Sequence, residues 1–162
     1  MGNRAALVAV LLAVLALPLQ AAADDDRLRF EGGIGVIPAR GGGAANTVRG
    51  TGPGGQPWVI SRLSADVRAS DGRISVDGRG LLLGGGDNIG FNGGQTVRAR
   101  LLCGLVAFDS EQTARLEPDG DFRIEGTLVG TLPTPCVTPV LLIVNVPATG
   151  AAVWFAAGIP KL

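Results

Sequence analysis

Apolar and polar residues alternate with a period of two along much of this chain. Between residues 73 and 79, Ile74 and Val76 alternate with charged and hydroxylated residues, and the stretches 96–105 and 121–129 repeat the pattern. Successive side chains of an extended strand point to opposite faces, so each stretch predicts a strand with one buried and one solvated face, as in antiparallel sheets. The expected inward-facing residues of the stretch 96–105 are Val97, Ala99, Leu101, Cys103 and Leu105.

Short turn sequences separate these strands. Ser-Asp-Gly at residues 70–72 lies between two alternating stretches, and Pro-Asp-Gly at residues 118–120 lies between two more. Glycine reaches positive φ values without a Cβ clash, and Pro and Asp favour the turn positions before it. Both sequences therefore predict β-hairpins.

The run 140–146 does not alternate, because it begins with five consecutive apolar residues. This pattern favours a central strand that is buried on both faces. Two glycine-rich stretches, 40–57 and 84–94, are expected to form long loops. About eight short strands at this spacing predict an all-β fold, an antiparallel β-sandwich, with a closed β-barrel as the alternative. The expected strands are 28–34, 58–69, 73–83, 96–105, 114–117, 121–128, 140–146 and 151–157.

Residues 1–23 have the pattern of a signal peptide. Arg4 supplies a positive charge, residues 5–19 are apolar apart from one proline, and small residues end the segment at Ala23. A membrane-spanning helix needs about 20 apolar residues, more than this stretch provides. We therefore expect cleavage after Ala23, one all-β domain over residues 24–162 without a transmembrane segment, and a secreted or periplasmic location. The excess of Arg over Lys and the abundance of Ala and Gly favour a bacterial source.

The chain contains two cysteines, Cys103 and Cys136. In an exported protein an even number of cysteines indicates a disulfide, and here one pairing exists. No His, C-x-x-C motif or third thiol accompanies them, as a metal or redox site would require. We predict a structural disulfide between the strand 96–105 and the beginning of the buried strand.

Composition excludes several classes of function. The chain has no His and no Tyr, which excludes His-based catalytic triads and imidazole metal sites. The 14 Lys and Arg residues are balanced by 14 Asp and Glu residues, so a basic stripe for nucleic acid is not expected. Neither a zinc ligand set nor a phosphate-binding glycine motif is present. We expect no cofactor, no metal and no nucleic-acid partner.

Carboxylates are the acid–base groups that remain. A pair of carboxylates is the minimum for most glycoside hydrolysis. Asp66, Asp77 and Glu125 fall on outward faces beside arginines, where cross-strand ion pairs explain them without catalysis. No catalytic residue is therefore assigned. The carboxylates considered are Asp66, Asp77, Asp87, Asp109, Glu111, Glu117, Asp119, Asp121 and Glu125.

Asp87, Asn88 and Asn92 are the oxygen donors of the second glycine-rich stretch. Such oxygens suit Ca²⁺, but a single carboxylate is a poor donor set, so we interpret the stretch as a flexible loop with these residues as a candidate ligand site. Trp58 and Trp154 have the chemistry to stack on a sugar ring, but their place in apolar strands favours the core.

These exclusions favour a binding module over an enzyme. We expect an exported β-domain that binds a protein or glycan partner through its two glycine-rich loops, because loops on a rigid sheet often carry recognition. One alternative is a carboxylate-based hydrolase that acts on a polysaccharide. The other is a structural envelope protein that self-associates through an exposed strand edge.

Overall fold

The computed structural model describes residues 26–39 and 46–161. The expected signal peptide and its cleavage site after Ala23 lie outside these residues. Every named element in the described part is a strand, which confirms the all-β class. None of the described residues belongs to a helix long and apolar enough to cross a bilayer. The strands are β1 (Arg27–Gly35), β2 (Trp58–Val59), β3 (Arg62–Arg68), β4 (Arg73–Arg79), β5 (Leu82–Leu83), β6 (Thr96–Cys103), β7 (Val106–Asp109), β8 (Ala114–Arg115), β9 (Phe122–Thr127), β10 (Val140–Asn145) and β11 (Trp154–Pro160).

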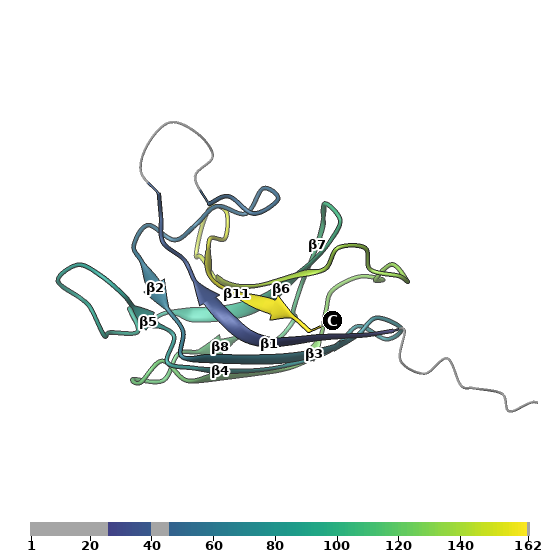
Figure 1. The fold of residues 1–162 in the computed structure, drawn as a ribbon, viewed down its shortest axis with the longest axis horizontal. Coiled ribbons are helices and arrows are strands. Elements are labelled where there is room, and N and C mark those ends of the chain that lie inside the picture. The colour runs from purple at the N-terminus through teal and green to yellow at the C-terminus, as the bar shows by residue number, and fades with distance from the viewer. Residues whose placement is uncertain (1–25, 40–45, 162) are drawn as a thin grey trace, which may run out of the picture.

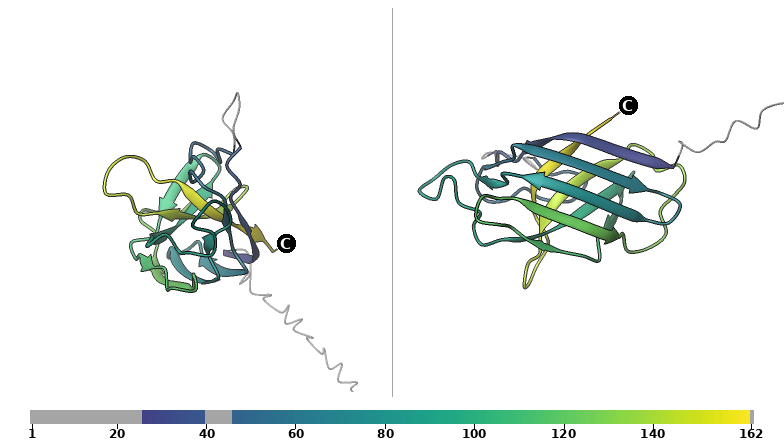
Figure 2. Two further views of the ribbon diagram at one scale, coloured as in Figure 1. Left: turned by 90° about the vertical axis from the view of Figure 1, so that its left-hand side faces the viewer. Right: turned by 90° about the horizontal axis from the view of Figure 1, so that it is seen from below.

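Nine of the strands form one antiparallel sheet that curls into a half-barrel (Figure 1). Its hydrogen-bonded order is β7-β6-β10-β11-β1-β3-β4-β9, with β8 beside β6, while β2 and β5 form a separate small sheet. Seen from below, β1, β3, β4 and β9 run side by side, and the yellow β11 crosses behind them (Figure 2). One curled sheet thus replaces the two packed sheets of the sandwich that we predicted. It is not closed into the barrel that we kept as the alternative.

β1 lies between β11 and β3 and so joins the strands β7, β6, β10 and β11 to the strands β3, β4 and β9. Residues 27–31 pair with β3, Phe30 and residues 33–35 pair with β11, and a β-bulge interrupts the pairing with β11 between Phe30 and Gly33. Gly32 within the bulge has a φ of 89°. At Gly33 a Cβ would lie 2.9 Å from the Cβ of Leu63, so a side chain has no room there. The two glycines let β1 bend while it pairs with both β3 and β11.

Both predicted glycine turns are present. Gly72 between β3 and β4 has a φ of 68°, and Gly120 before β9 has a φ of 83°. The second turn is closed by a 2.9 Å hydrogen bond from Glu117 N to Asp121 O. However, the preceding strand β8 forms its ladder with β6 instead of β9. Two predicted long strands are also divided, one into β2 and β3 and the other into β4 and β5.

Leu105 is not an inward-facing residue, contrary to the prediction. β6 ends at Cys103, the chain turns at Gly104 with a φ of 60°, and Leu105 is 84% exposed. The turn leads directly into β7, a strand that the sequence pattern did not predict.

β10 is buried on both faces, as predicted. Leu141, Leu142, Ile143 and Val144 are each 0% exposed, and β10 lies between β6 and β11. On the outer face, Leu142 lies opposite Arg100 of β6. Asp109 holds the Arg100 guanidinium at 2.6 and 2.8 Å, and Thr51 accepts a third hydrogen bond at 3.2 Å. Arginine stems and the segment that contains Thr51 thus cover the outer side of this strand.

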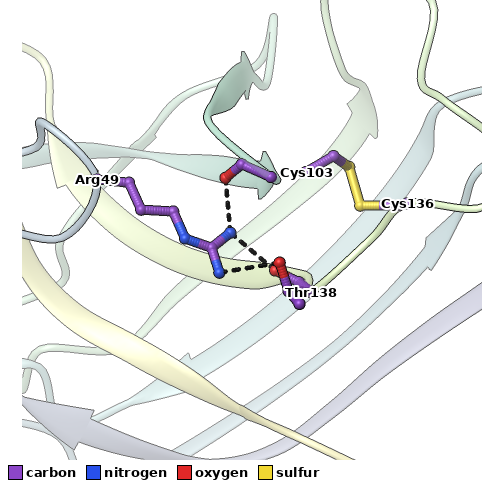
Figure 3. Close-up of a disulfide and its surroundings, with 5 residues drawn as sticks. Arg49, Cys103, Cys136 and Thr138 are labelled. Carbon is purple, nitrogen blue, oxygen red and sulfur yellow. Dashed lines mark hydrogen bonds between the residues drawn. A yellow bond between two sulfur atoms is a disulfide. The ribbon is translucent and has the colours of Figure 1, made fainter.

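The disulfide joins Cys103, at the end of β6, to Cys136, which precedes β10 (Figure 3). This confirms the predicted pairing. Arg49 reinforces the same end of the molecule, because its Nη1 donates to the carbonyl oxygens of Gly104 at 2.7 Å and Thr138 at 2.8 Å. The backbone before β10 is therefore fixed by both a sulfur bridge and a guanidinium group.

The two edges of the half-barrel meet at one point. Ser110, after β7, forms an isolated antiparallel bridge with Leu128, after β9. Ser110 is 0% exposed, and its Oγ accepts a hydrogen bond from Ala99 N (3.1 Å) while donating to Gln112 O (2.6 Å). The hydroxyl thus satisfies buried backbone groups where the ladder between β6 and β7 ends.

Candidate functional site

A pocket of about 370 Å³ opens at the end of the half-barrel that carries β2 and β5. We call it the mouth pocket. Gln95 precedes β6 and Asn145 ends β10, so the mouth pocket lies at the opposite end of these strands from Cys103. Its lining residues are Gly55, Gln56, Trp58, Leu83, Asn88, Gly93, Gln95, Asn145 and Phe155.

A stacked aromatic pair forms the floor of the mouth pocket. The rings of Trp58 and Phe155 lie 4.1 Å apart between centroids, with 18° between their planes. Each residue is 4% exposed, and Trp154 beside them is 7% exposed. Both tryptophans therefore belong to the core, as predicted, although Trp58 also meets the pocket.

The two glycine-rich stretches converge on this aromatic pair. A Cβ at Gly54 would lie 3.0 Å from Cδ1 of Phe155, and a Cβ at Gly93 would lie 3.4 Å from Cη2 of Trp58. The absence of a side chain thus allows Gly54 to approach Phe155 closely, whereas a Cβ at Gly93 would make an ordinary van der Waals contact with Trp58. The loops expected to carry recognition are brought to one site.

Four carboxamide side chains surround the floor, and much of their hydrogen-bonding capacity is unused. Asn145 Oδ1 accepts a hydrogen bond from Val153 N at 2.8 Å, which leaves its Nδ2 as a donor. Gln95 Nε2 donates to a backbone carbonyl at 3.3 Å, which leaves its Oε1 as an acceptor. The side chains of Gln56 and Asn88 form no hydrogen bond within the part of the chain that the structure describes.

The described lining of the mouth pocket is uncharged. Among the described residues, no Asp, Glu, Lys or Arg contributes to its lining. Sequence reasoning singled out Asn88 but missed Gln56, Gln95 and Asn145. A signal for two of these was present, because Gln56 and Gln95 each lie at one end of a glycine-rich stretch.

The candidate ligand residues Asp87, Asn88 and Asn92 lie on one loop, where their surroundings differ. Asn88 lines the mouth pocket, whereas Asp87 is exposed on the same loop. The Asn92 Nδ2 donates to Glu117 O at 2.8 Å, and its Oδ1 accepts from Gly94 N at 2.9 Å. Asn92 therefore anchors the loop to the segment after β8. Within residues 26–39 and 46–161, no three His, Cys, Asp or Glu residues gather as a metal-binding group.

A second pocket, a groove of about 440 Å³, lies on the outer face of β3, β4 and β9. It contains Asp66 and Glu125, which lie on either side of Ser75 in the sheet register. Asp66 forms an ion pair with Arg29 on the neighbouring strand at 3.6 Å, and Glu125 accepts a 2.7 Å hydrogen bond from Arg123. Asp66 therefore has the predicted cross-strand arginine partner, whereas the partner of Glu125 lies two residues away on the same strand, β9.

The arginines of the outer groove are also paired. Arg68 and Arg73 both contact Asp71, at 3.1 and 3.5 Å. The backbone N–H of Arg73, together with these guanidinium groups, lowers the pKa of the Asp71 carboxyl. A lowered pKa favours the ionised form, whereas a general acid at neutral pH needs a raised one. The groove thus has the character of a solvated ion-pair surface.

Comparison of this chain with models of known protein families, with curated proteins and with solved structures found no match. The function is therefore argued from the residues and the geometry of the site.

Proposed function

We propose that this protein is a binding module that holds a small polar ligand in the mouth pocket. The observation that carries the proposal is the convergence of both glycine-rich loops, with four carboxamides, over the Trp58–Phe155 pair. An apolar floor with a few oriented polar groups is the usual construction of a small-ligand site. The volume of about 370 Å³ lies at the lower end of the range for such sites, about 300–1,000 Å³.

The mouth pocket supports this function better than the outer groove does. The charged groups of the groove already have partners within the sheet, whereas polar atoms of Gln56, Asn88 and Asn145 face the pocket without one among the described residues. Gln56 and Asn88 are exposed, so a ligand that bonds to them replaces water, and each such hydrogen bond contributes about 0.5–1.5 kcal/mol net.

Two glycine positions provide a matched test. Gly55 lines the pocket and Gly52 does not, yet a Cβ at either position would meet no atom within 4 Å and neither has a positive φ. We expect Gly55→Leu to fill the pocket and abolish binding, while Gly52→Leu binds like the wild type.

The measurement is isothermal titration calorimetry with the processed protein against neutral sugars, acidic sugars, nucleotides and short peptides at millimolar concentrations. Heat of binding that disappears in Gly55→Leu and persists in Gly52→Leu supports the proposal. No binding of any compound, or equal binding by both variants, contradicts it.

We also propose that the protein is exported, with cleavage after Ala23. The Cys103–Cys136 disulfide supports this location, because such bonds persist in oxidising compartments. Expression of the full chain in a bacterial host should yield an exported protein whose mass corresponds to residues 24–162. Intact protein retained in the cytoplasm would contradict the proposal.

A further inference from the structure

We infer that the ligand of the mouth pocket is an uncharged saccharide, an inference that rests on the proposed binding function. The absence of charge in the described lining favours an uncharged ligand. A phosphate or carboxylate ligand is usually met by Arg or Lys, and a cationic ligand by carboxylates. Although the chain carries 14 basic and 14 acidic residues, the pocket lining described here contains carboxamides in their place.

The free hydrogen-bonding groups of the pocket are complementary to the hydroxyls of a sugar. A sugar hydroxyl is both a donor and an acceptor, and neighbouring hydroxyls present these functions side by side. The pocket offers the Asn145 Nδ2 as a donor and the Gln95 Oε1 as an acceptor. Gln56 and Asn88 add carboxamides that supply both functions. This mixture matches a polyhydroxylated ligand better than one that only accepts or only donates.

The pocket combines this polar rim with an apolar floor, and this combination also favours a sugar. A pyranose ring has a C–H face and a rim of hydroxyls, so it contacts apolar and polar groups at the same time. A small apolar area beside the carboxamides comes from Trp58, Phe155 and Leu83, which are 4%, 4% and 6% exposed. The small volume suits one or two sugar rings, such as the end of a glycan chain.

Asn145→Asp is a sharp test of this inference, because it changes one function of the side chain. The variant keeps the oxygen that accepts from Val153 N and replaces the unused Nδ2 donor with a charged acceptor. We expect neutral-saccharide affinity to fall about tenfold or more. The paired variant Gln56→Ala/Asn88→Ala should weaken it by a similar factor. Gln112→Ala, an exposed carboxamide outside the pocket, should leave it unchanged.

The probes are glucose, galactose, mannose and N-acetylglucosamine with their β-linked and α-linked disaccharides, and glucuronic acid as the charged counterpart of glucose. Binding is followed by calorimetry and by tryptophan fluorescence, since Trp58 lies in the pocket floor. Thermal unfolding of each variant verifies that it is folded at the assay temperature.

Neutral saccharides that bind the wild type, prefer it to Asn145→Asp, and outcompete glucuronic acid support the inference. Binding of peptides or acidic compounds at the Gly55-sensitive site, without neutral saccharides, overturns the inference and leaves the proposed binding function intact. No binding of any probe overturns both.

Discussion

Gly120 shows how one missing side chain fixes the approach of two segments. Its φ is 83°, and a Cβ there would lie 2.6 Å from both the backbone N and the carbonyl O of Leu81. The two residues are joined by a 2.9 Å hydrogen bond from Leu81 N to Gly120 O. Glycine is thus required at this position for two separate reasons, the left-handed backbone and the close contact.

Gly150 has the left-handed backbone without the close contact: its φ is 84°, but no atom lies within 4 Å of an added Cβ. We expect Gly150→Ala to lower the free energy of unfolding by about 1–2 kcal/mol through backbone strain alone. Gly120→Ala should lower it by roughly 3 kcal/mol or more, because the clash adds to that strain. Urea denaturation measures both values, and equal losses would show that the contact with Leu81 relaxes freely.

At the same scale, the sequence predicted the residues whose role depends on near neighbours. Gly72 and Gly120 were found from their turn sequences, and Trp58 was placed in the core from its apolar strand. The sequence did not indicate the contact of the Asn92 side chain with the carbonyl of Glu117, because that carbonyl lies 25 residues away in the chain. Gln56, Gln95 and Asn145 were missed for the same reason, since they converge only after the sheet has curled.

At the scale of elements, Asp121 attaches the turn before β9 to the end of β4. Its carboxylate accepts hydrogen bonds from Arg79 Nη1 at 2.6 Å and from Gly80 N at 3.0 Å. These hydrogen bonds lower the pKa of Asp121 below its ordinary value of 3.8, and the Arg79 side chain is the larger cause. The folded state therefore binds this proton less readily than the unfolded state does.

This shift predicts an acid-dependent loss of stability. A lowered pKa in the folded state stabilises the protein at pH values above the ordinary carboxyl pKa, and that stabilisation disappears as the pH falls through the folded value. We expect Asp121→Asn to be less stable than the wild type at pH 7, and this difference to shrink as the pH falls through the lowered pKa of Asp121. Urea denaturation at several pH values measures the difference. Because the pair is exposed, 1 M NaCl should reduce the difference at pH 7, and a difference that does not shrink as the pH is lowered would contradict the assignment.

Elements with a distinctive pattern were predicted well, whereas those that depend on chain reversal were not. The apolar run of β10 indicated burial on both faces, and each of Leu141–Val144 is 0% exposed. β7 was missed because apolar residues continue through Gly104 into Leu105 and Val106, which hides the turn between two strands. The division of β4 from β5 at Gly80 was missed because the apolar alternation also runs across it.

At the scale of the whole molecule, the choice between two packed sheets and one curled sheet depends on β1. The alternating pattern fixes which side of a strand is buried, but it does not say how many neighbours the strand has. Gly32 and Gly33 let β1 bend while it pairs with β3 on one side and β11 on the other, so that one continuous sheet forms the half-barrel. The mouth pocket could not be predicted without this curl, because its walls come from segments as distant as Gln56 and Phe155.

The disulfide acts at this same scale, because its 33-residue separation encloses β7 and β9, the two edge strands of the half-barrel. Closing a loop of that size stabilises a fold by about 3–4 kcal/mol on the chain-entropy model. We expect Cys103→Ala/Cys136→Ala to lose about this much stability in urea denaturation. The mouth pocket lies at the far end of β6, so the folded double variant should keep the ligand affinity of the wild type. A loss below about 1 kcal/mol would show that the Arg49 contacts and the Ser110–Leu128 bridge hold the edges without the sulfur link.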